Sequence, residues 1–297
     1  MGTASPSGGL LAAGALMVNA AIWGMSWWPF RELQHHGLHP LWATAAVYLL
    51  ISLGMSAFYF SAWRGLLAQP QLWLLALAAG LTNVCFNWAV TVGDVVRVVL
   101  LFYLMPAWSV LIAWALLDEK PSRASLLRLL LAMAGVLIVL KTPGSAWPVP
   151  QSVADYLALL GGLCFALTNV LLLKFNQTAS SSRMLAMFVG GAVLPGAVAL
   201  MGLALGTLTA PALQLSGVAV FVGLTLAFVA SNMMLQYGAA RLAASTTALV
   251  MLTEILFAGV SAAMWDATDL SPRVFWGGSL IVLAALWAAV AHPKNQA

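Results

Sequence analysis

The sequence predicts an all-α integral membrane protein, in which ten transmembrane helices form two inverted five-helix repeats around a central cavity. Hydrophobic residues make up 63% of the chain and charged residues only 7%, which is more apolar surface than a water-soluble domain can cover. These apolar residues fall into runs of roughly 20, the length that a helix needs to cross a bilayer. Polar residues in two pairs of runs also match at a constant spacing, which indicates an internal repeat.

The apolar runs are too long for membrane β-strands, which have only about 9–11 residues and alternate in polarity. The first run has no charged leading segment, so we expect it to stay as a helix and not to be cleaved as a signal peptide. The loops are short, which leaves no room for an attached soluble domain. The ten predicted segments are 10–30, 41–63, 72–92, 95–117, 125–140, 154–173, 184–205, 213–237, 244–265 and 272–291.

Lysine and arginine in the short loops predict the orientation, because cytoplasmic loops are enriched in these residues. With the N-terminus inside, eight basic residues lie on the inner side and four on the outer side. The inner set is Arg64, Lys120, Arg123, Arg128, Lys174, Arg183, Arg241 and Lys294, and the outer set is Arg31, Arg97, Lys141 and Arg273. Both termini are therefore predicted to be cytoplasmic, in the cytoplasmic (inner) membrane.

The repeat appears when 149 is added to positions in the third and fourth segments. Polar and aromatic residues then fall on chemically similar ones, and "TNVCFNWAV" matches "SNMMLQYGA". An odd number of crossings in each repeat makes the second copy enter from the opposite side, as in many secondary transporters. The matched pairs are Thr82 with Ser231, Asn83 with Asn232, Asn87 with Gln236, Trp88 with Tyr237 and Trp108 with Phe257.

The repeat divides the chain into two predicted halves. The expected parts are a short cytoplasmic N-terminus (1–9), a first five-helix repeat (10–140), a linker (141–153), a second five-helix repeat (154–291) and a cytoplasmic C-terminus (292–297).

A proline interrupts the fourth segment. Pro106 has no backbone donor and its ring clashes with the carbonyl of Phe102, so we expect the helix to bend near mid-membrane. Such a bend could line a cavity or serve as a hinge, or it could be a static kink, since proline is common in membrane helices. Pro106 is the hinge candidate.

The stretches "LMPAWSVLIAWALLDEKPS" and "AAIWGMSWWPF" resemble the fourth and first helices of the ten-helix, EamA-type members of the drug/metabolite transporter superfamily. The resemblance covers essentially the whole chain, and is greatest to exporters of amino acids and related metabolites. It implies a basket of helices around a central cavity. We expect no enzymatic activity, because the sequence lacks a catalytic constellation of residues. Ile255 stands where many relatives have a proline, and "MWDATDLSP" replaces the usual acidic exit. The resemblance therefore does not predict a bend in the ninth segment.

Aromatic and amide side chains near the proline are candidates for a substrate cavity, because an apolar pocket with a few polar groups suits a small amphiphilic solute. Each of them could instead serve helix packing or the interfacial aromatic belt. The candidates are Trp23, Asn83, Asn87, Trp88, Phe102, Tyr103, Trp108, Asn169, Asn232, Gln236, Tyr237 and Ser245.

Glu254 lies about ten residues inside the ninth segment, between apolar neighbours. An unpaired carboxylate is costly in hydrocarbon, and intramembrane carboxyls often carry protons or bind cations. We therefore take Glu254 as the coupling candidate, with protons as a candidate partner. The alternative is a structural carboxyl that is protonated or paired with an arginine.

Other classes of function lack the residues that they need. Cys85 and Cys164 have no metal-like neighbours, and "HHGLH" lacks a supporting carboxylate pattern beyond Glu32, so no metal site is expected. No phosphate-binding loop appears, and the basic residues are too scattered to bind nucleic acid. No cofactor is expected. We therefore predict an exporter of amino acids or similar small amphiphilic metabolites, with a proton-coupled multidrug exporter of lipophilic cations and a non-transporting receptor or scaffold as alternatives.

Overall fold

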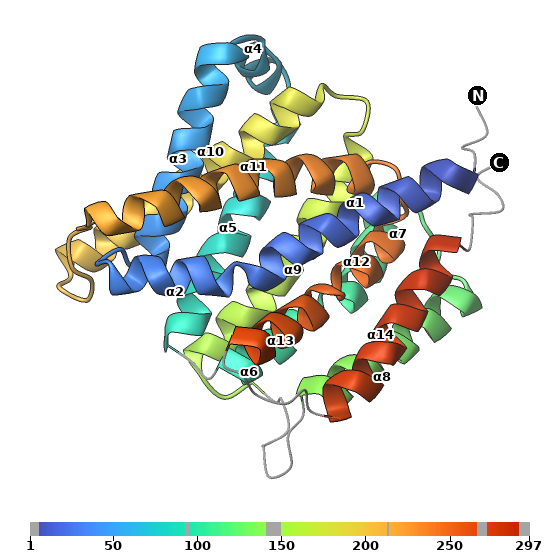
Figure 1. Cartoon of the computed structure of the whole chain (residues 1–297). Helices are drawn as coiled ribbons and strands as arrows, with labels where there is room; N and C mark the ends of the chain where they lie inside the picture. The colour runs from blue at the N-terminus through green and yellow to red at the C-terminus, as the bar shows by residue number, and fades with distance from the viewer. Residues whose placement is uncertain (1–5, 93–94, 141–149, 213, 266–271, 291–297) are drawn as a thin grey trace.

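The computed structural model describes residues 6–92, 95–140, 150–212, 214–265 and 272–290 (Figure 1). Within those ranges the chain forms fourteen α-helices and one short 3₁₀ helix, and it has no strand. The first half contains α1 (Pro6–Met25), α2 (Trp27–His35), α3 (Pro40–Phe58), α4 (Ser61–Ala68), α5 (Gln71–Val92), α6 (Val95–Phe102), α7 (Met105–Leu117) and α8 (Arg123–Leu140). The second half contains α9 (Val153–Lys174), α10 (Ser180–Ala204), η1 (Leu215–Gly217), α11 (Val218–Ala239), α12 (Ala244–Met251), α13 (Glu254–Trp265) and α14 (Pro272–Val290).

The all-α membrane class predicted from the sequence is confirmed. Seven helical stretches of the described residues are long and apolar enough to cross a membrane. Met105–Leu117 and Phe275–Ala288 are apolar but shorter. Helices are found in each of the ten predicted segments, while the count of ten crossings stays a prediction.

Four of the predicted segments are interrupted instead of continuous. The first is divided at Ser26, between α1 and α2. The second, 41–63, is divided at Tyr59 and Phe60, between α3 and α4. The fourth breaks between Phe102 and Met105, and the ninth breaks between Met251 and Glu254. The two later breaks are 149 residues apart at both edges, which is the spacing of the sequence match.

The two breaks share a hydrogen-bonding pattern, although only the first is next to a proline. The amide of Leu104 donates to the Leu101 carbonyl at 3.3 Å, and the amide of Thr253 donates to the Val250 carbonyl at 3.1 Å. These bonds form tight 3₁₀-type turns, which interrupt an α-helix. Pro106 is the second residue of α7, in the first turn of the helix, where a missing donor costs nothing. In the second half, the Thr253 hydroxyl donates to the Val250 carbonyl at 2.8 Å and supports the turn without a proline.

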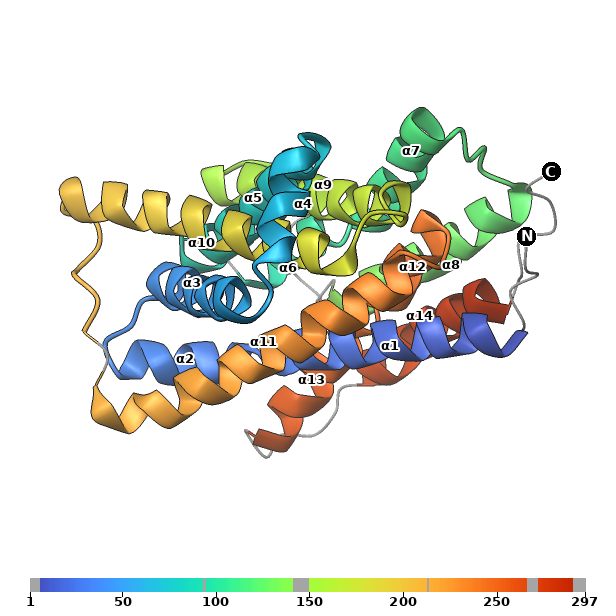
Figure 2. The ribbon, with the colours of Figure 1, turned by 90° about the horizontal axis from the view of Figure 1, so that it is seen from above.

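Helices of the two halves pack against each other throughout the molecule (Figure 2). α1 lies along α11, α5 packs between α9 and α10, and α8 pairs with α14. Because membrane helices associate through close van der Waals contact, small residues matter where their backbones meet.

Two glycines bring the first helix of each half against the break of the other half. A Cβ atom at Gly24 of α1 would lie 2.6 Å from the carbonyl oxygen of Glu254, at the start of α13. A Cβ atom at Gly162 of α9 would overlap the carbonyl oxygen of Phe102, at the end of α6. The breaks are therefore packed into the centre of the protein, not exposed at its edge.

Candidate functional site

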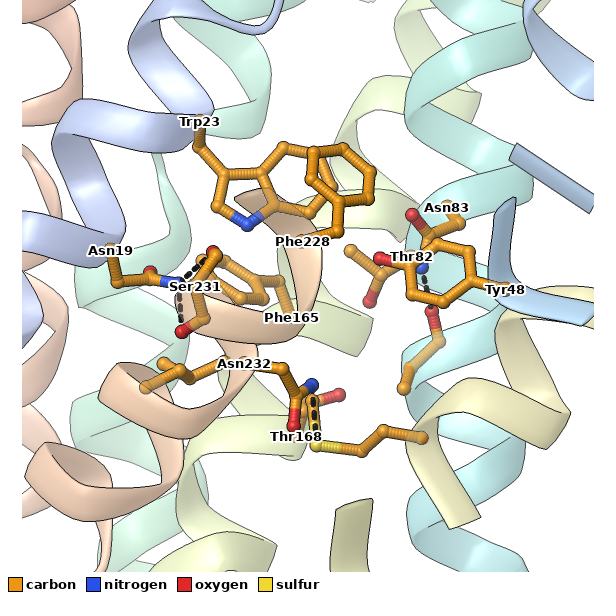
Figure 3. Close-up of a pocket in the computed structure, with 13 residues that line it drawn as sticks. Asn19, Trp23, Tyr48, Thr82, Asn83, Phe165, Thr168, Phe228, Ser231 and Asn232 are labelled. Atoms are coloured by element: carbon orange, nitrogen blue, oxygen red, sulfur yellow. Dashed lines mark hydrogen bonds between the residues drawn. The ribbon is translucent and has the colours of Figure 1, made fainter. Parts of the chain in front are cut away.

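A small cavity of about 50 Å³ lies where helices of both halves converge (Figure 3). Six helices supply its walls: α1, α3 and α5 from the first half, and α9, α10 and α11 from the second. The lining residues are Asn19, Trp23, Tyr48, Ala79, Thr82, Asn83, Phe165, Thr168, Met187, Phe228, Ser231, Asn232 and Leu235.

Aromatic rings form one wall of the cavity. Trp23 stacks on Phe228 with ring centroids 4.7 Å apart, and Figure 3 shows the two rings side by side. Tyr48 lies on the other side of Phe228, at 5.8 Å. These contacts tie α1 and α3 to α11 and give the cavity a flat apolar face.

Amide groups face the cavity beside the rings. The side chain of Asn19 donates to the carbonyl oxygen of Ser231 at 2.9 Å, while its own oxygen Oδ1 is buried and has no hydrogen-bond partner among the described residues. Asn232 donates to the sulfur of Met187 at 3.6 Å. A sulfur is a weak acceptor, so the amides of Asn19 and Asn232 retain hydrogen-bonding capacity that a solute could use.

The polar bonds around the cavity repeat between the halves. In the first half, Asn87 of α5 donates to Thr44 of α3 at 2.7 Å, and Asn83 is hydrogen-bonded to Tyr48. In the second half, the equivalents of Asn87 and Asn83 in α11 are Gln236 and Asn232, which bond to α10. Gln236 accepts from Arg183 at 3.3 Å, and Asn232 contacts Met187.

The constant spacing of these bonds extends the internal sequence repeat from α5 and α11 to their partner helices, α3 and α10. The residues of α5 and α11 are related by 149 positions. Their partners in α3 and α10, Thr44 with Arg183 and Tyr48 with Met187, are both related by 139 positions. Two pairs of helices therefore carry two polar contacts at equivalent positions and in the same order, although the partners differ in chemistry.

Tyr103 and Glu254 connect the two breaks. Tyr103 lies in the turn between α6 and α7, and Glu254 is the first residue of α13. Their side chains form a hydrogen bond, in which the phenol donates to the carboxylate. Glu254 is the one carboxyl among the predicted site residues. It is therefore hydrogen-bonded to a side chain from the other half of the protein.

Comparison with known proteins agrees with this architecture. Residues 10–141 match the EamA-like transporter family. This match spans the first of the two predicted halves and agrees with the resemblance seen in the sequence. A crystal structure of a protein superposes on this chain with a TM-score of 0.78, over 99% of this chain and 100% of that one, at 14% sequence identity. At this identity the likeness shows the fold alone. No curated protein matches the chain.

Three of the predicted substrate residues, Trp23, Asn83 and Asn232, line the cavity. Asn87 and Gln236 lie one helical turn away and hold Thr44 and Arg183.

The remaining predicted residues lie elsewhere. Phe102 packs against Phe86, with centroids 4.7 Å apart, and Tyr103 holds Glu254. Trp108 and Asn169 have buried polar atoms without a partner among the described residues. Tyr237 lies 3.8 Å from the guanidinium of Arg241. Trp88 and Ser245 are half-buried and do not line the cavity.

Several cavity residues were not predicted. Thr82 and Ser231 belonged to the matched pairs and could have been chosen on that ground. Tyr48, Phe165 and Phe228 lie in uniformly apolar runs, where the sequence gives no sign of which face turns inward.

The histidine-rich turn does not gather metal ligands, since the described residues contain no group of three that could hold a metal ion. His36 contacts Glu32 at 3.2 Å and Ser216 at 3.1 Å, and so ties α2 to the segment before α11. Burial lowers the pKa of His39, whose Nδ1 accepts a hydrogen bond from the Leu41 amide at 3.2 Å at the start of α3.

Proposed function

We propose that this protein is a secondary transporter that exports amino acids or similar small amphiphilic metabolites across the cytoplasmic membrane by alternating access. The single observation that carries the proposal is the cavity between the two halves, with an aromatic face and under-used amides. Such a lining suits a solute that has both an apolar part and polar groups. Export is chosen as the direction because the sequence resembles exporters.

The proposed architecture has ten crossings, as two inverted repeats over residues 10–140 and 154–291, with both termini cytoplasmic. The matched breaks and the matched bonds of α5 with α3 and of α11 with α10 support two copies of one unit. Five crossings in each copy would place the copies in opposite orientations. Three of the basic groups that predict the orientation lie outside the described part of the structure. The structure does not describe Lys141, Lys294 or the side chain of Arg97.

The size of the cavity supports a transport cycle with more than one state. About 50 Å³ is room for a few water molecules, whereas sites for small molecules have about 300–1,000 Å³. A solute would therefore need the helices around Trp23, Tyr48 and Phe228 to separate. Alternating access provides that movement, and the breaks beside Pro106 and Thr253 are suited to act as hinges because they contain fewer regular helical bonds.

Glu254 is proposed as the coupling residue. A carboxyl at a helix break can be neutral in an apolar setting, or charged when water or a cation reaches it. A transporter needs a group whose interactions differ between two states, because equal interactions shift nothing. Breaking and forming the hydrogen bond from Tyr103 would give Glu254 such a difference.

A proton-coupled exporter of lipophilic cations is the second candidate function. The aromatic wall of Trp23, Tyr48 and Phe228 could bind a flat cation, and Glu254 could neutralise it. A receptor or scaffold without transport is the candidate from a different class.

Flux into proteoliposomes that contain only the purified chain tests the proposal. We expect saturable uptake of labelled leucine that unlabelled amphiphilic amino acids inhibit. Labelled tetraphenylphosphonium uptake driven by a pH gradient would favour the multidrug alternative. Flux equal to that of empty liposomes for both solutes would contradict transport.

A further inference from the structure

Arg183 is a buried cation that has no acidic partner among the described residues. Its side chain is 5% exposed, near the start of α10. Its Nε donates to Gln236 at 3.3 Å and its Nη1 donates to the carbonyl of Phe175 at 2.8 Å. Its Nη2 group makes no hydrogen bond to a described residue. Because a guanidinium has only donors, the oxygen of the Gln236 amide, and not its nitrogen, faces Arg183.

A second guanidinium lies close by. Arg241 is close enough to Arg183 for their charges to repel. It is exposed, and it rests on the Tyr237 ring and donates to the Tyr237 carbonyl at 2.9 Å. The ion pair found among the described residues joins Glu32 and His36, so neither arginine is neutralised by a described carboxylate. Two like charges repel, and an anion between them would remove that repulsion.

The matching bond in the other half shows that this position does not need a charge. There the neutral hydroxyl of Thr44 accepts from Asn87 at 2.7 Å and connects the equivalent helices. Orientation in the membrane does not need it either, because exposed basic residues in the loops, such as Arg64 and Arg241, supply that signal. The charge of Arg183 therefore calls for a different explanation.

A chain of hydrogen bonds connects Arg183 to the cavity. Gln236 accepts from Arg183 through its oxygen and donates through its nitrogen to Asn232 at 2.8 Å. Asn232 in turn lines the cavity. An anion at Arg183 would thus lie one amide side chain away from a residue that lines the cavity.

We propose that Arg183 and Arg241 form an anion-binding site beside the cavity, which takes the carboxylate of the transported solute. The planar guanidinium of Arg183, whose Nη2 and second Nη1 hydrogen are not used by any described residue, can hold a carboxylate by two parallel bonds. Arg241 at the surface attracts the anion. This inference rests on the proposed transport function and restricts its substrates to small organic carboxylates, zwitterionic amino acids included.

Binding of isovalerate and isovaleramide to the purified chain in neutral detergent tests the site, because these probes have the same shape and differ in charge. Intrinsic tryptophan fluorescence provides the signal. We expect isovalerate to bind about tenfold or more tightly than isovaleramide. Arg183→Gln should remove that preference, Arg241→Gln should weaken isovalerate severalfold, and the exposed control Arg123→Gln should behave as the wild type.

Several outcomes would overturn the inference. One is that the wild type binds isovalerate and isovaleramide equally well. Another is that isovalerate shows no saturable binding below about 10 mM. If Arg183→Gln does not fold, the acid-to-amide ratio of the wild type and the effect of Arg241→Gln decide. Loss of isovalerate binding when phosphatidylglycerol is added would show that the arginines hold a lipid phosphate instead, and would also overturn it.

Flux measurements separate this inference from the transport proposal. A chain that moves leucine and leucinamide equally well across proteoliposomes would be a transporter without the carboxylate site. A chain that prefers isovalerate through Arg183 but moves no solute would have the site without transport.

Discussion

The Tyr103 phenol donates a hydrogen bond to the Glu254 carboxylate, and so joins two helix breaks that lie at equivalent positions of the two halves. Neither residue lines the small cavity. Any rearrangement of one half against the other would change this bond, because α6 and α7 belong to the first half and α13 to the second. The bond is therefore suited to report, and to control, the relative position of the halves.

Glu254→Gln should fold and bind solute but lose the pH dependence of flux. Glutamine retains the size and can still accept from Tyr103, but it cannot exchange a proton. Flux from proteoliposomes measured across a series of pH values checks this. An unchanged pH profile and rate would assign Glu254 to structure.

Tyr103→Phe should change the same pH profile without removing it. The carboxyl would lose its phenol donor but would keep its ability to titrate. Phe275→Ala, at an exposed ring of α14, serves as the control and should leave the profile as in the wild type. If the pH profile of Tyr103→Phe is identical to that of the wild type, the hydrogen bond between Tyr103 and Glu254 has no role in coupling protons to transport.

Phe228→Ala should widen the range of solutes. Removing this ring enlarges the cavity and frees the Trp23 face, so bulkier apolar side chains should compete better for flux. The loss of a buried ring also costs about 3–5 kcal/mol, so protein yield must be measured in parallel. Reduced yield with unchanged selectivity would place Phe228 in packing alone.

Gly162→Ala should lower the thermal midpoint, whereas Gly223→Ala should not. The new methyl group at 162 would overlap the Phe102 carbonyl, while nothing lies within 4 Å of the position at 223. Overpacking costs about 1–3 kcal/mol, but glycine to alanine in an open helical position gains up to about 1 kcal/mol. Equal midpoints in detergent would show that α9 can move away from the first break.

Protonation of His39 should destabilise the start of α3. Because burial lowers its pKa from the ordinary value of 6.5, the folded state favours the neutral ring. Its contribution is complete above pH 6.5 and is lost as the pH falls through the lowered folded-state value. A cap is worth about 1 kcal/mol, so the thermal midpoint should fall by about 2–4 °C on acidification.

His39→Asn is the matched variant, since asparagine caps a helix without titrating in this range. Its midpoint should fall less between neutral and acidic pH than that of the wild type. A parallel fall in both proteins would mean that other groups determine the acid response.

The helices and the repeat could be predicted because their signals are local in the sequence. Length and apolarity define a membrane helix, and the polar pairs from Thr82 to Tyr237 fixed the 149-residue spacing. The second break was not predicted, because it depends on the Thr253 hydroxyl and not on a proline. Its location at the same spacing could have been inferred from the first break.

The lining of the cavity was predicted only in part. In a soluble helix, polarity distinguishes the inner face from the outer one, but in a membrane lipid and core are both apolar. The inward orientation of Phe228 and Tyr48, and the location of Trp108 away from the cavity, therefore depend on packing angles that no short pattern encodes. Amides were better guides, because Asn83 and Asn232 must find polar neighbours.

The direction in which the two broken helices cross the membrane tests the account most directly. Lys120 follows the first broken helix, and Met264 lies at the end of the second and is exposed. Single cysteines at these positions, with Cys85 and Cys164 replaced by alanine, can be labelled by a membrane-impermeant thiol reagent in sealed vesicles of known orientation. Inverted repeats predict reaction of Lys120→Cys from the cytoplasmic side and of Met264→Cys from the opposite side. Reaction of both from the same side would contradict the inverted repeat and the transport mechanism built on it.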